Sequence, residues 1–340
     1  MITFCAIGTY AHRQPLAYPQ IRAHCLPQIR VTEDPGRADI VAVSHTKDLE
    51  IFGAGLRRSL SRDQRLILLS EEPFWDTCWG TSPLERDLVH DTPDGPLPLT
   101  QLNHVTSAIY DFDKIPYFPL TSAHFSTRYT RWFSRNSMRS ASGWKEHLTS
   151  SLGQAVFMMA RRKSPRYEVT FPQAGVFSIC NQRTAIAEAC QGVEMVHLGQ
   201  GWHDTPPRQG LTDWHLDKFL TLDGGYCFVS AIENTHQYSY VTEKLFDAYA
   251  VGAVPLYVAG TPHRVHELAL PGTWLNLLDV PFQEIPELMA DFAMTPAFFE
   301  VYAEQQAGLA RLFGDRDILH AELARLSAAL FDEFSGVLER

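Results

Sequence analysis

The stretch from Tyr226 to Gly260 constrains the fold of this chain more than any other. Its sequence, YCFVSAIENTHQYSYVTEKLFDAYAVGAVPLYVAG, holds an apolar run, a polar loop, a helix-like segment and a second apolar run. That order predicts strand, loop, helix and strand, which is the repeating unit of a parallel sheet. The predicted helix begins at Glu243 and Lys244. Its free N–H groups and the positive end of its dipole, beside a lysine, favour an anion such as a diphosphate.

The same strand–helix alternation recurs in two halves of the chain. In the first half we expect helices near Ile21 and over 49–60, and strands at 1–8, 37–44 and 65–70. The segments 106–110 and 117–120 are expected to add edge strands, and the Pro- and Gly-rich segment 80–102 reads as a surface excursion. In the second half, after a helical or irregular stretch over 121–164, we expect helices at 183–190 and 243–251 and strands at 175–180, 193–199, 226–231 and 254–258.

A chain of 340 residues favours two domains. The expected division is an N-terminal domain over 1–155, a second domain over 156–315, and a C-terminal helix over 316–340. That helix carries an apolar stripe that we expect to dock on the domains, formed by Leu319, Leu323, Leu326, Leu330 and Phe334. The predicted fold class is therefore α/β, with two facing Rossmann-like domains and a ligand cleft at the carboxyl ends of their strands.

Composition limits the partners and the compartment. The net charge of −10 disfavours a nonspecific nucleic-acid binder, and no apolar run reaches the roughly 20 residues that span a bilayer. The six scattered cysteines predict buried free thiols in a reducing compartment, hence a cytoplasmic protein. The basic run 161–163 with Arg166 is interpreted as a solvated linker, with a peripheral membrane or anion contact as the alternative. Nothing in the sequence indicates an oligomeric state.

The motif at 232–260, IENTHQYSYVTEKLFDAYAVGAVPLYVAG, resembles the signature of the bacterial α-1,3/4-fucosyltransferases. The strand VFSICN at 176–181 with Arg183, and the segment Glu71-Glu72-Pro73, are similar to further segments of that family. So are RADIV at 37–41 and AIYDFD at 108–113. Similarity covers most of residues 30–295 in the family's order and is strong over 226–260. Ile232 departs from the family, which usually has Phe there.

The resemblance implies a GT-B-type glycosyltransferase that holds GDP-fucose in its second domain and inverts the anomeric carbon without an obligatory metal. Lys244 and Arg183 are then expected to bind the diphosphate and Glu243 the ribose hydroxyls. Tyr240 is expected to flank the nucleotide or sugar, and Glu233 and Asn234 to face the sugar. Taken singly, Glu243 is equally well interpreted as an ordinary acid at a helix start. Lys244 and Arg183 are equally well interpreted as exposed side chains.

Inversion also needs a general base for the acceptor hydroxyl. Glu71 and Glu72 are the candidates, and alignment on Pro73 favours Glu71, while two solvated loop carboxylates remain the alternative. Repulsion within such a pair would raise one pKa. Trp75 and Trp79 are weaker candidates for stacking on the acceptor. Asp111 and Asp113 resemble a DxD metal motif but are interpreted as structural.

The expected function is transfer of L-fucose from GDP-fucose to a saccharide hydroxyl of an oligosaccharide or glycolipid. The expected position is O3, or O4, of an N-acetylglucosamine or glucose unit in a lactosamine-type glycan. Two alternatives stay open: the same scaffold using another GDP- or UDP-sugar, and a noncatalytic sugar-nucleotide-binding protein.

Overall fold

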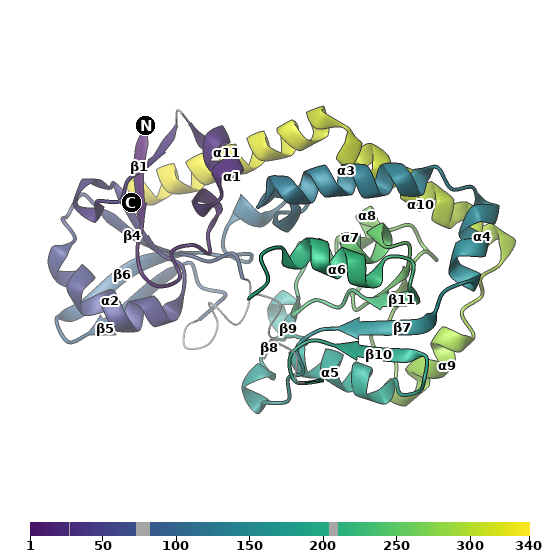
Figure 1. Ribbon diagram of the computed structural model, residues 1–340. Helices are drawn as coiled ribbons and strands as arrows, with labels where there is room; N and C mark the ends of the chain where they lie inside the picture. The colour runs from purple at the N-terminus through teal and green to yellow at the C-terminus, as the bar shows by residue number, and fades with distance from the viewer. Residues whose placement is uncertain (27, 73–81, 204–209) are drawn as a thin grey trace. The chain divides into compact units, whose positions relative to one another are not determined.

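The structure is a computed structural model that describes residues 1–26, 28–72, 82–203 and 210–340 (Figure 1). The chain divides into two compact units: unit 1 contains residues 1–123 and 317–340, and unit 2 contains residues 124–316. The division after residue 123 differs from the expected boundary at 155. The reason is that helices α3 (Ala123–Ser137) and α4 (Ala141–Thr149) pack into unit 2, where Asn136 donates to the carbonyls of Tyr249 and Ala250.

Unit 1 is built on a six-stranded sheet with the order β2-β1-β3-β4-β6-β5. Every neighbouring pair in it is parallel except the β5–β6 hairpin. The strands are β1 (Ile2–Ala6), β2 (Ile29–Val31), β3 (Ile40–Val43), β4 (Arg65–Leu69), β5 (Asp87–Thr92) and β6 (Gly95–Leu102). The predicted strands at 1–8, 37–44 and 65–70 are therefore confirmed.

Helices cover both faces of this sheet. Helix α2 (Thr46–Ser59) packs Leu49 and Leu56 on one face, whereas α1 (Pro19–Cys25) and α11 (Arg316–Leu338) lie on the other (Figure 1). The predicted stripe of α11 is buried at Leu323, Leu326, Leu330 and Phe334. The ring of Phe334 stacks on that of Phe4 with centroids 5.4 Å apart. The C-terminal helix is therefore part of unit 1.

Two local predictions in unit 1 are wrong. The segment 80–102, expected as a surface excursion, contributes the hairpin of β5 and β6. Its prolines are tolerated because Pro96 and Pro98 lie where β6 extends beyond its pairing with β4, so no second neighbour needs their missing N–H. The expected edge strands at 106–110 and 117–120 are short 3-10 turns, Ala108–Tyr110 and Phe118–Leu120. Ser107 caps the first of them through the N–H of Ile109.

Unit 2 has a five-stranded parallel sheet with the order β10-β7-β11-β13-β14. Its strands are β7 (Gly153–Met158), β10 (Met195–Leu198), β11 (Tyr226–Ser230), β13 (Val254–Tyr257) and β14 (Leu275–Asn276). Strand β7 lies between β10 and β11 in the sheet, although its segment was expected to be helical or irregular. A short antiparallel sheet of β8 (Thr170–Phe171), β9 (Val176–Ser178) and β12 (Thr235–His236) accounts for the strand expected at 175–180.

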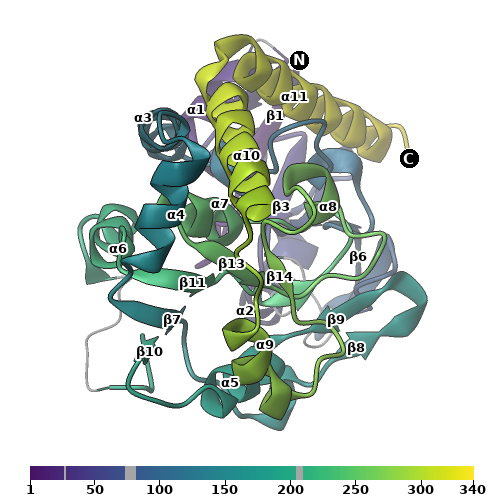
Figure 2. The same ribbon diagram turned by 90° about the vertical axis from the view of Figure 1, so that its right-hand side faces the viewer.

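Helices pack on both sides of the parallel sheet of unit 2. Figure 2 shows α4, α6 and α7 on one side and α5 and α9 on the other. The bounds are α5 (Cys180–Ala189), α6 (Trp214–Leu222), α7 (Glu243–Ala250), α8 (Val265–Leu268), α9 (Ile285–Ala290) and α10 (Pro296–Gly314). Each unit is thus an open α/β sheet with helices on both faces, and the predicted α/β class is confirmed. Residues at or just after the carboxyl ends of β7, β10 and β11 line one cavity together with the first residues of α7.

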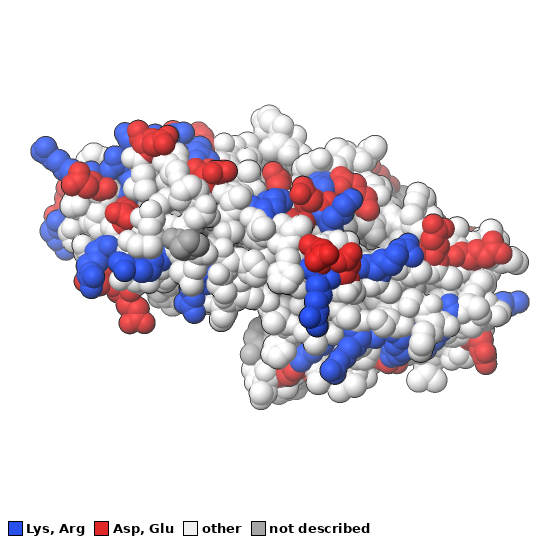
Figure 3. Space-filling view, turned by 90° about the horizontal axis from the view of Figure 1, so that it is seen from above, with Lys and Arg blue, Asp and Glu red and all other residues white. Residues whose placement is uncertain are grey.

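The charged surface and the hydropathy of the helices are those expected of a chain with 20% charged residues and no long apolar run. On the face seen in Figure 3, Lys and Arg side chains lie interspersed with Asp and Glu. Among the described helices, none has both the length and the apolar character required to cross a bilayer.

One buried carboxylate fixes α11 to the loop at 113–115. Glu322 is 2% exposed and accepts hydrogen bonds from the backbone N–H groups of Asp113, Lys114 and Ile115. Arg325 also donates to it at 2.5 Å. The backbone N–H of Asp113, in the DxD-like segment, therefore helps to hold α11 against this loop.

We predict that Glu322→Ala lowers the stability of the protein by about 2–4 kcal/mol, because three backbone N–H groups, including the buried one of Ile115, lose their acceptor and Arg325 loses its partner. A lower urea midpoint in circular dichroism would show this. Asp332→Ala, at an exposed position of the same helix, is the matched control and should unfold like the wild type. Equal midpoints for the two variants would contradict the role given to Glu322.

Candidate functional site

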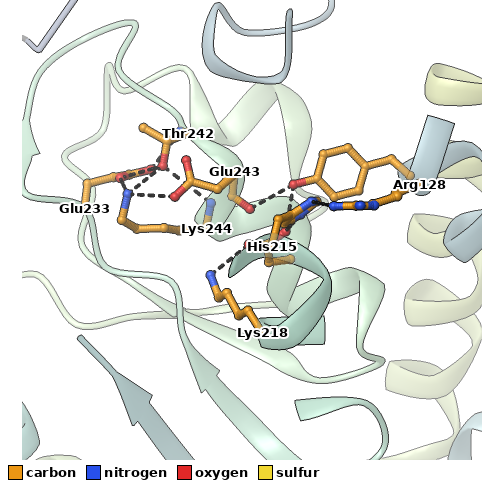
Figure 4. A network of polar contacts seen from close by, with 9 residues as sticks. Arg128, His215, Lys218, Glu233, Thr242, Glu243 and Lys244 are labelled. Carbon is orange, nitrogen blue, oxygen red and sulfur yellow. Dashed lines mark hydrogen bonds and ion pairs between the residues drawn. The ribbon is translucent and has the colours of Figure 1, made fainter. Parts of the chain in front are cut away.

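The beginning of α7 is organised around a buried glutamate from the preceding loop. Glu233, 1% exposed, accepts hydrogen bonds from the N–H and the hydroxyl of Thr242, each at 2.8 Å. The Thr242 hydroxyl is also the cap of α7, since it accepts from the N–H of Lys244. Figure 4 shows Glu233, Thr242, Glu243 and Lys244 drawn together at this helix start. Thr242 therefore links the buried glutamate to the first turn of α7.

Lys244 is held by three oxygen atoms of the protein. Its Nζ lies 3.0 Å from Oε2 of Glu233, 2.9 Å from Oγ1 of Thr242 and 3.3 Å from Oε1 of Glu243. Burial acts to lower the pKa of Lys244, but the charges of Glu233 and Glu243 outweigh it and raise that pKa. Burial likewise acts to raise the pKa of Glu243, and the charges of Lys244 and Lys218 reverse the effect and lower it. Lys244 and Glu243 are therefore a fixed pair of opposite charges.

Arg183 is a buried cation whose hydrogen bonding is incomplete. It lies on α5 and is 4% exposed. Within the described residues its Nε has no hydrogen-bond partner. Burial and the charge of Arg162 lower the pKa of its guanidinium, while Glu233 and Tyr240 lie close enough to raise it. A buried N–H without an acceptor costs about 1–3 kcal/mol, so this guanidinium is well placed for an anionic ligand.

Asn234 and Tyr240 lie around the same helix starts. The carbonyl of Asn234 accepts from the N–H of Ile179 at 2.9 Å, which ties the loop after β11 to the beginning of α5. Tyr240 is 1% exposed. The structure thus brings together Arg183, Glu233, Asn234, Tyr240, Glu243 and Lys244, which the sequence places up to 61 residues apart (244 less 183).

A cavity of about 180 Å³ opens beside Glu243 and Lys244. Its walls come from the carboxyl ends of the parallel strands: Met158 of β7, Gly199 after β10 and Ser230 of β11. Helix α6 closes it with Trp214 and Lys218. Ligands of open α/β sheets bind at this edge of the sheet, so the cavity is the candidate ligand site of unit 2.

A polar network beside this cavity escaped the sequence analysis. Asp247 on α7 accepts from Nζ of Lys218 at 2.8 Å, from Nε2 of His215 at 2.8 Å and from the hydroxyl of Tyr129 at 2.7 Å. Arg128 continues the network through Nδ1 of His215 at 3.3 Å (Figure 4). It also pairs with Asp213. The residues come from α3, α6 and α7, and no motif in the sequence joins them. In the sequence, Asp247 stands within a predicted helix and looks like an ordinary exposed acidic residue, so it was not singled out.

Unit 1 holds the predicted base. Glu71 follows β4 and is 5% exposed. Its two carboxylate oxygens accept from the hydroxyls of Tyr18 at 2.6 Å and Tyr117 at 2.7 Å. Burial raises the pKa of Glu71 to about 7, against the two tyrosine hydrogen bonds that lower it. The charge of Glu72 adds to the increase, as expected for a close pair of carboxylates.

Glu71 and Glu72 differ in exposure. Glu71 is buried and Glu72 is half-buried, so the interpretation of both as solvated loop carboxylates is wrong for Glu71. The proposed acceptor residues Trp75 and Trp79, with the neighbouring Pro73, lie outside the described residues.

Comparison with known proteins gives the class of the second unit. Residues 181–303 match the model of "Glycosyltransferase family 10 (fucosyltransferase) C-term". Residues 181–303 are therefore similar to the C-terminal part of the family 10 glycosyltransferases, the fucosyltransferases, and the resemblance described for the motif at 232–260 is confirmed. The match includes Arg183, Glu233, Asn234, Tyr240, Glu243 and Lys244 and covers 123 of the 340 residues (303 − 181 + 1).

Individual relatives are distant. The chain is 26% identical over 168 residues to "GDP-fucose protein O-fucosyltransferase 3" of Danio rerio, covering 48% of this chain and 32% of that protein. It thus spans about a third of that relative's length. Solved structures described as "Crystal Structure of alpha1,3-Fucosyltransferase" and "Crystal Structure of alpha1,3-Fucosyltransferase with GDP-fucose" are 18% and 14% identical, with TM-scores of 0.43 and 0.42. The first alignment covers 90% of this chain and 80% of the other, the second 100% and 90%.

We predict that the carboxyl group of Glu71 titrates near pH 7 and that Tyr117→Phe moves its pKa higher. The tyrosine hydroxyl stabilises the ionised carboxylate, so its removal favours the protonated form. Carbon-13 NMR of glutamate-labelled protein would measure the titration, with Glu71→Gln assigning the signal. A Glu71 pKa near 4.5 in the wild type would contradict the desolvated environment described above.

Proposed function

We propose that this protein transfers L-fucose from GDP-fucose to a hydroxyl group, with inversion at the anomeric carbon and without an obligatory divalent metal. The observation that carries the proposal is the family match over residues 181–303. Within this segment, Arg183 lies in the first turn of α5 and Lys244 in the first turn of α7. Preplaced cations at helix N-termini stabilise the negative charge that develops on the leaving diphosphate.

The roles of the donor residues follow from their surroundings. Arg183 has a buried N–H group available for a phosphate oxygen, and a guanidinium can bind two such oxygens at once. Lys244 supplies positive charge at the start of α7. Glu243 lines the cavity with a carboxylate that accepts from ribose hydroxyls. Glu233 is engaged with Thr242 and Lys244, so its part in donor binding is to fix Lys244.

Glu71 is the proposed general base for the acceptor hydroxyl. A base whose pKa lies near the operating pH accepts a proton readily and still exists largely in the ionised form. The pKa of about 7 meets this condition. Tyr18 and Tyr117 hold its oxygens in place.

Two acceptor classes are compatible with the relatives. We propose a saccharide acceptor first, at O3 or O4 of an N-acetylglucosamine or glucose unit, because the motif at 232–260 resembles the α-1,3/4-fucosyltransferases. The name of the Danio rerio relative, a protein O-fucosyltransferase, favours a protein hydroxyl as the second candidate. Other GDP- or UDP-sugars remain the alternative donors.

Calorimetry and a transfer assay test the proposal. GDP and GDP-fucose should bind the protein, and UDP should bind more weakly. Fucose transfer is then measured against Galβ1-4GlcNAc, Galβ1-3GlcNAc, their glucose analogues and a folded protein acceptor, with and without EDTA. Transfer to one acceptor class that persists in EDTA supports the proposal. Binding of none of the nucleotides would exclude the transferase function.

We expect Lys244→Ala to weaken GDP binding about tenfold or more, since the variant loses a charge close to the diphosphate. Isothermal titration calorimetry gives the dissociation constant. Lys145→Ala, at an exposed position of α4, is the control and should bind GDP like the wild type. Unchanged GDP affinity in a folded Lys244→Ala protein would show that the diphosphate lies elsewhere.

We expect Glu71→Ala to abolish transfer while GDP affinity stays within about twofold of wild type. In the wild type, kcat/KM should rise with pH through about 7, because the carboxyl group must lose its proton to act as a base. Glu72→Ala is the matched control and should retain transfer. If Glu72→Ala is the inactive variant, the base is Glu72.

A further inference from the structure

We propose that Lys218 is a further donor-binding residue, whose ammonium group contacts the diphosphate in the cavity of unit 2 and is held there by Asp247. This inference rests on the proposed function in that the diphosphate belongs to a nucleotide-sugar donor. It assigns a role to α6, which none of the motifs in the sequence includes.

Polar and charged side chains line the cavity of unit 2, and one of them has no partner within the described residues. Lys218, Lys244, Glu243 and Ser230 all line it. Ser230 is 7% exposed, and across the described residues no hydrogen-bond partner is found for its Oγ. A buried hydroxyl without a partner is uncommon in native structures and indicates that a ligand or water completes its bonding. The hydroxyl of Ser230 and the ammonium group of Lys218 offer hydrogen-bond donors to phosphate oxygens, and Lys244 adds positive charge.

Lys218 has hydrogen-bonding capacity to spare, whereas Lys244 does not. An ammonium group has three N–H donors. Those of Lys244 face Glu233, Thr242 and Glu243. For Lys218, the described part of the chain provides one acceptor, Oδ2 of Asp247 at 2.8 Å. Two donors of Lys218 therefore remain for a ligand.

The lining of the cavity leads to the same residue. The two carboxylates around Lys244, those of Glu233 and Glu243, offset the charges of Lys244 and Arg183. A diphosphate brings further negative charge into this region. Lys218 is the other lysine that lines the cavity, whereas its partner Asp247 lies outside the lining, so the ammonium group and not the carboxylate faces a ligand. Glu243 is the carboxylate in the lining, and its position is consistent with binding ribose rather than phosphate.

Asp247 fixes the ammonium group in position. One of its oxygens accepts from Lys218, and the other accepts from His215 and Tyr129. Burial acts to raise the pKa of Asp247, but Lys218 and His215 outweigh it and hold that pKa well below its usual range. The carboxylate is therefore ionised at neutral pH and orients Lys218 before a ligand arrives.

The size of the cavity restricts what it holds. At about 180 Å³ it is smaller than the roughly 300–1,000 Å³ of pockets that enclose a whole drug-sized ligand. A diphosphate with part of the ribose is a suitable fragment, whereas a complete nucleotide sugar extends beyond it.

The test compares Lys218→Met with the wild type by calorimetry against GDP and against guanosine. Methionine keeps most of the side-chain volume and removes the charge. We expect GDP to bind about tenfold or more weakly, and guanosine, which has no phosphate, to bind as in the wild type. Lys145→Met is the matched control and should change neither affinity. Unchanged GDP affinity in Lys218→Met overturns the inference.

A double variant and a second nucleotide are added to this calorimetric test. Lys218→Met leaves Asp247 with one cationic partner fewer, so the double variant Lys218→Met/Asp247→Asn, which removes both charges, is measured alongside. The same loss of GDP affinity in a folded double variant supports the inference, and full affinity overturns it. If the wild type binds UDP but not GDP, the proposed donor is wrong, and Lys218 is tested with UDP and uridine. Wild-type protein that binds neither nucleotide overturns both proposals.

Discussion

The buried ion pair of Glu233 and Lys244 is the interaction on which unit 2 depends. It joins the loop after β11 to the beginning of α7, and Thr242 connects the two through its backbone N–H and its hydroxyl. Removing one partner of such a pair leaves the other charge buried and costs several kcal/mol. The pair thus fixes the beginning of α7. Because Glu243 is the first residue of that helix and lines the cavity, its position is fixed as well.

Two buried sites of the protein treat charge in opposite ways. The site in unit 2 gathers several acids and bases close together, and their charges persist inside the protein. In unit 1, burial of the Glu71 carboxylate among tyrosines brings its ionisation to neutral pH. The first arrangement is favourable for holding a charged ligand, whereas the second is favourable for moving a proton. Both can be derived from desolvation and neighbouring charge alone.

Local sequence signals predicted the regular parts of the fold well. The parallel strands at 65–69 and 254–257 and the helix at 243–250 appear where apolar runs and spacing indicate them. Strand β7 was missed because its short run, GQAVFM, acquires strand character only from its neighbours on both sides. In the site, Glu243 and Lys244 belong to a sequence motif, so they could be predicted. Lys218 and Asp247 are joined by a contact between two helices, and no spacing in the sequence indicates that contact.

Asp247 also has a mechanical consequence. Its carboxylate receives hydrogen bonds from α3 and α6 while it belongs to α7, so three helices share one anchor. Outward movement of any one of them would leave a buried charge without its partner, which costs several kcal/mol. The contact therefore restrains α6 and α7, both of which line the cavity. A site that is ordered before a ligand enters loses less conformational entropy on binding.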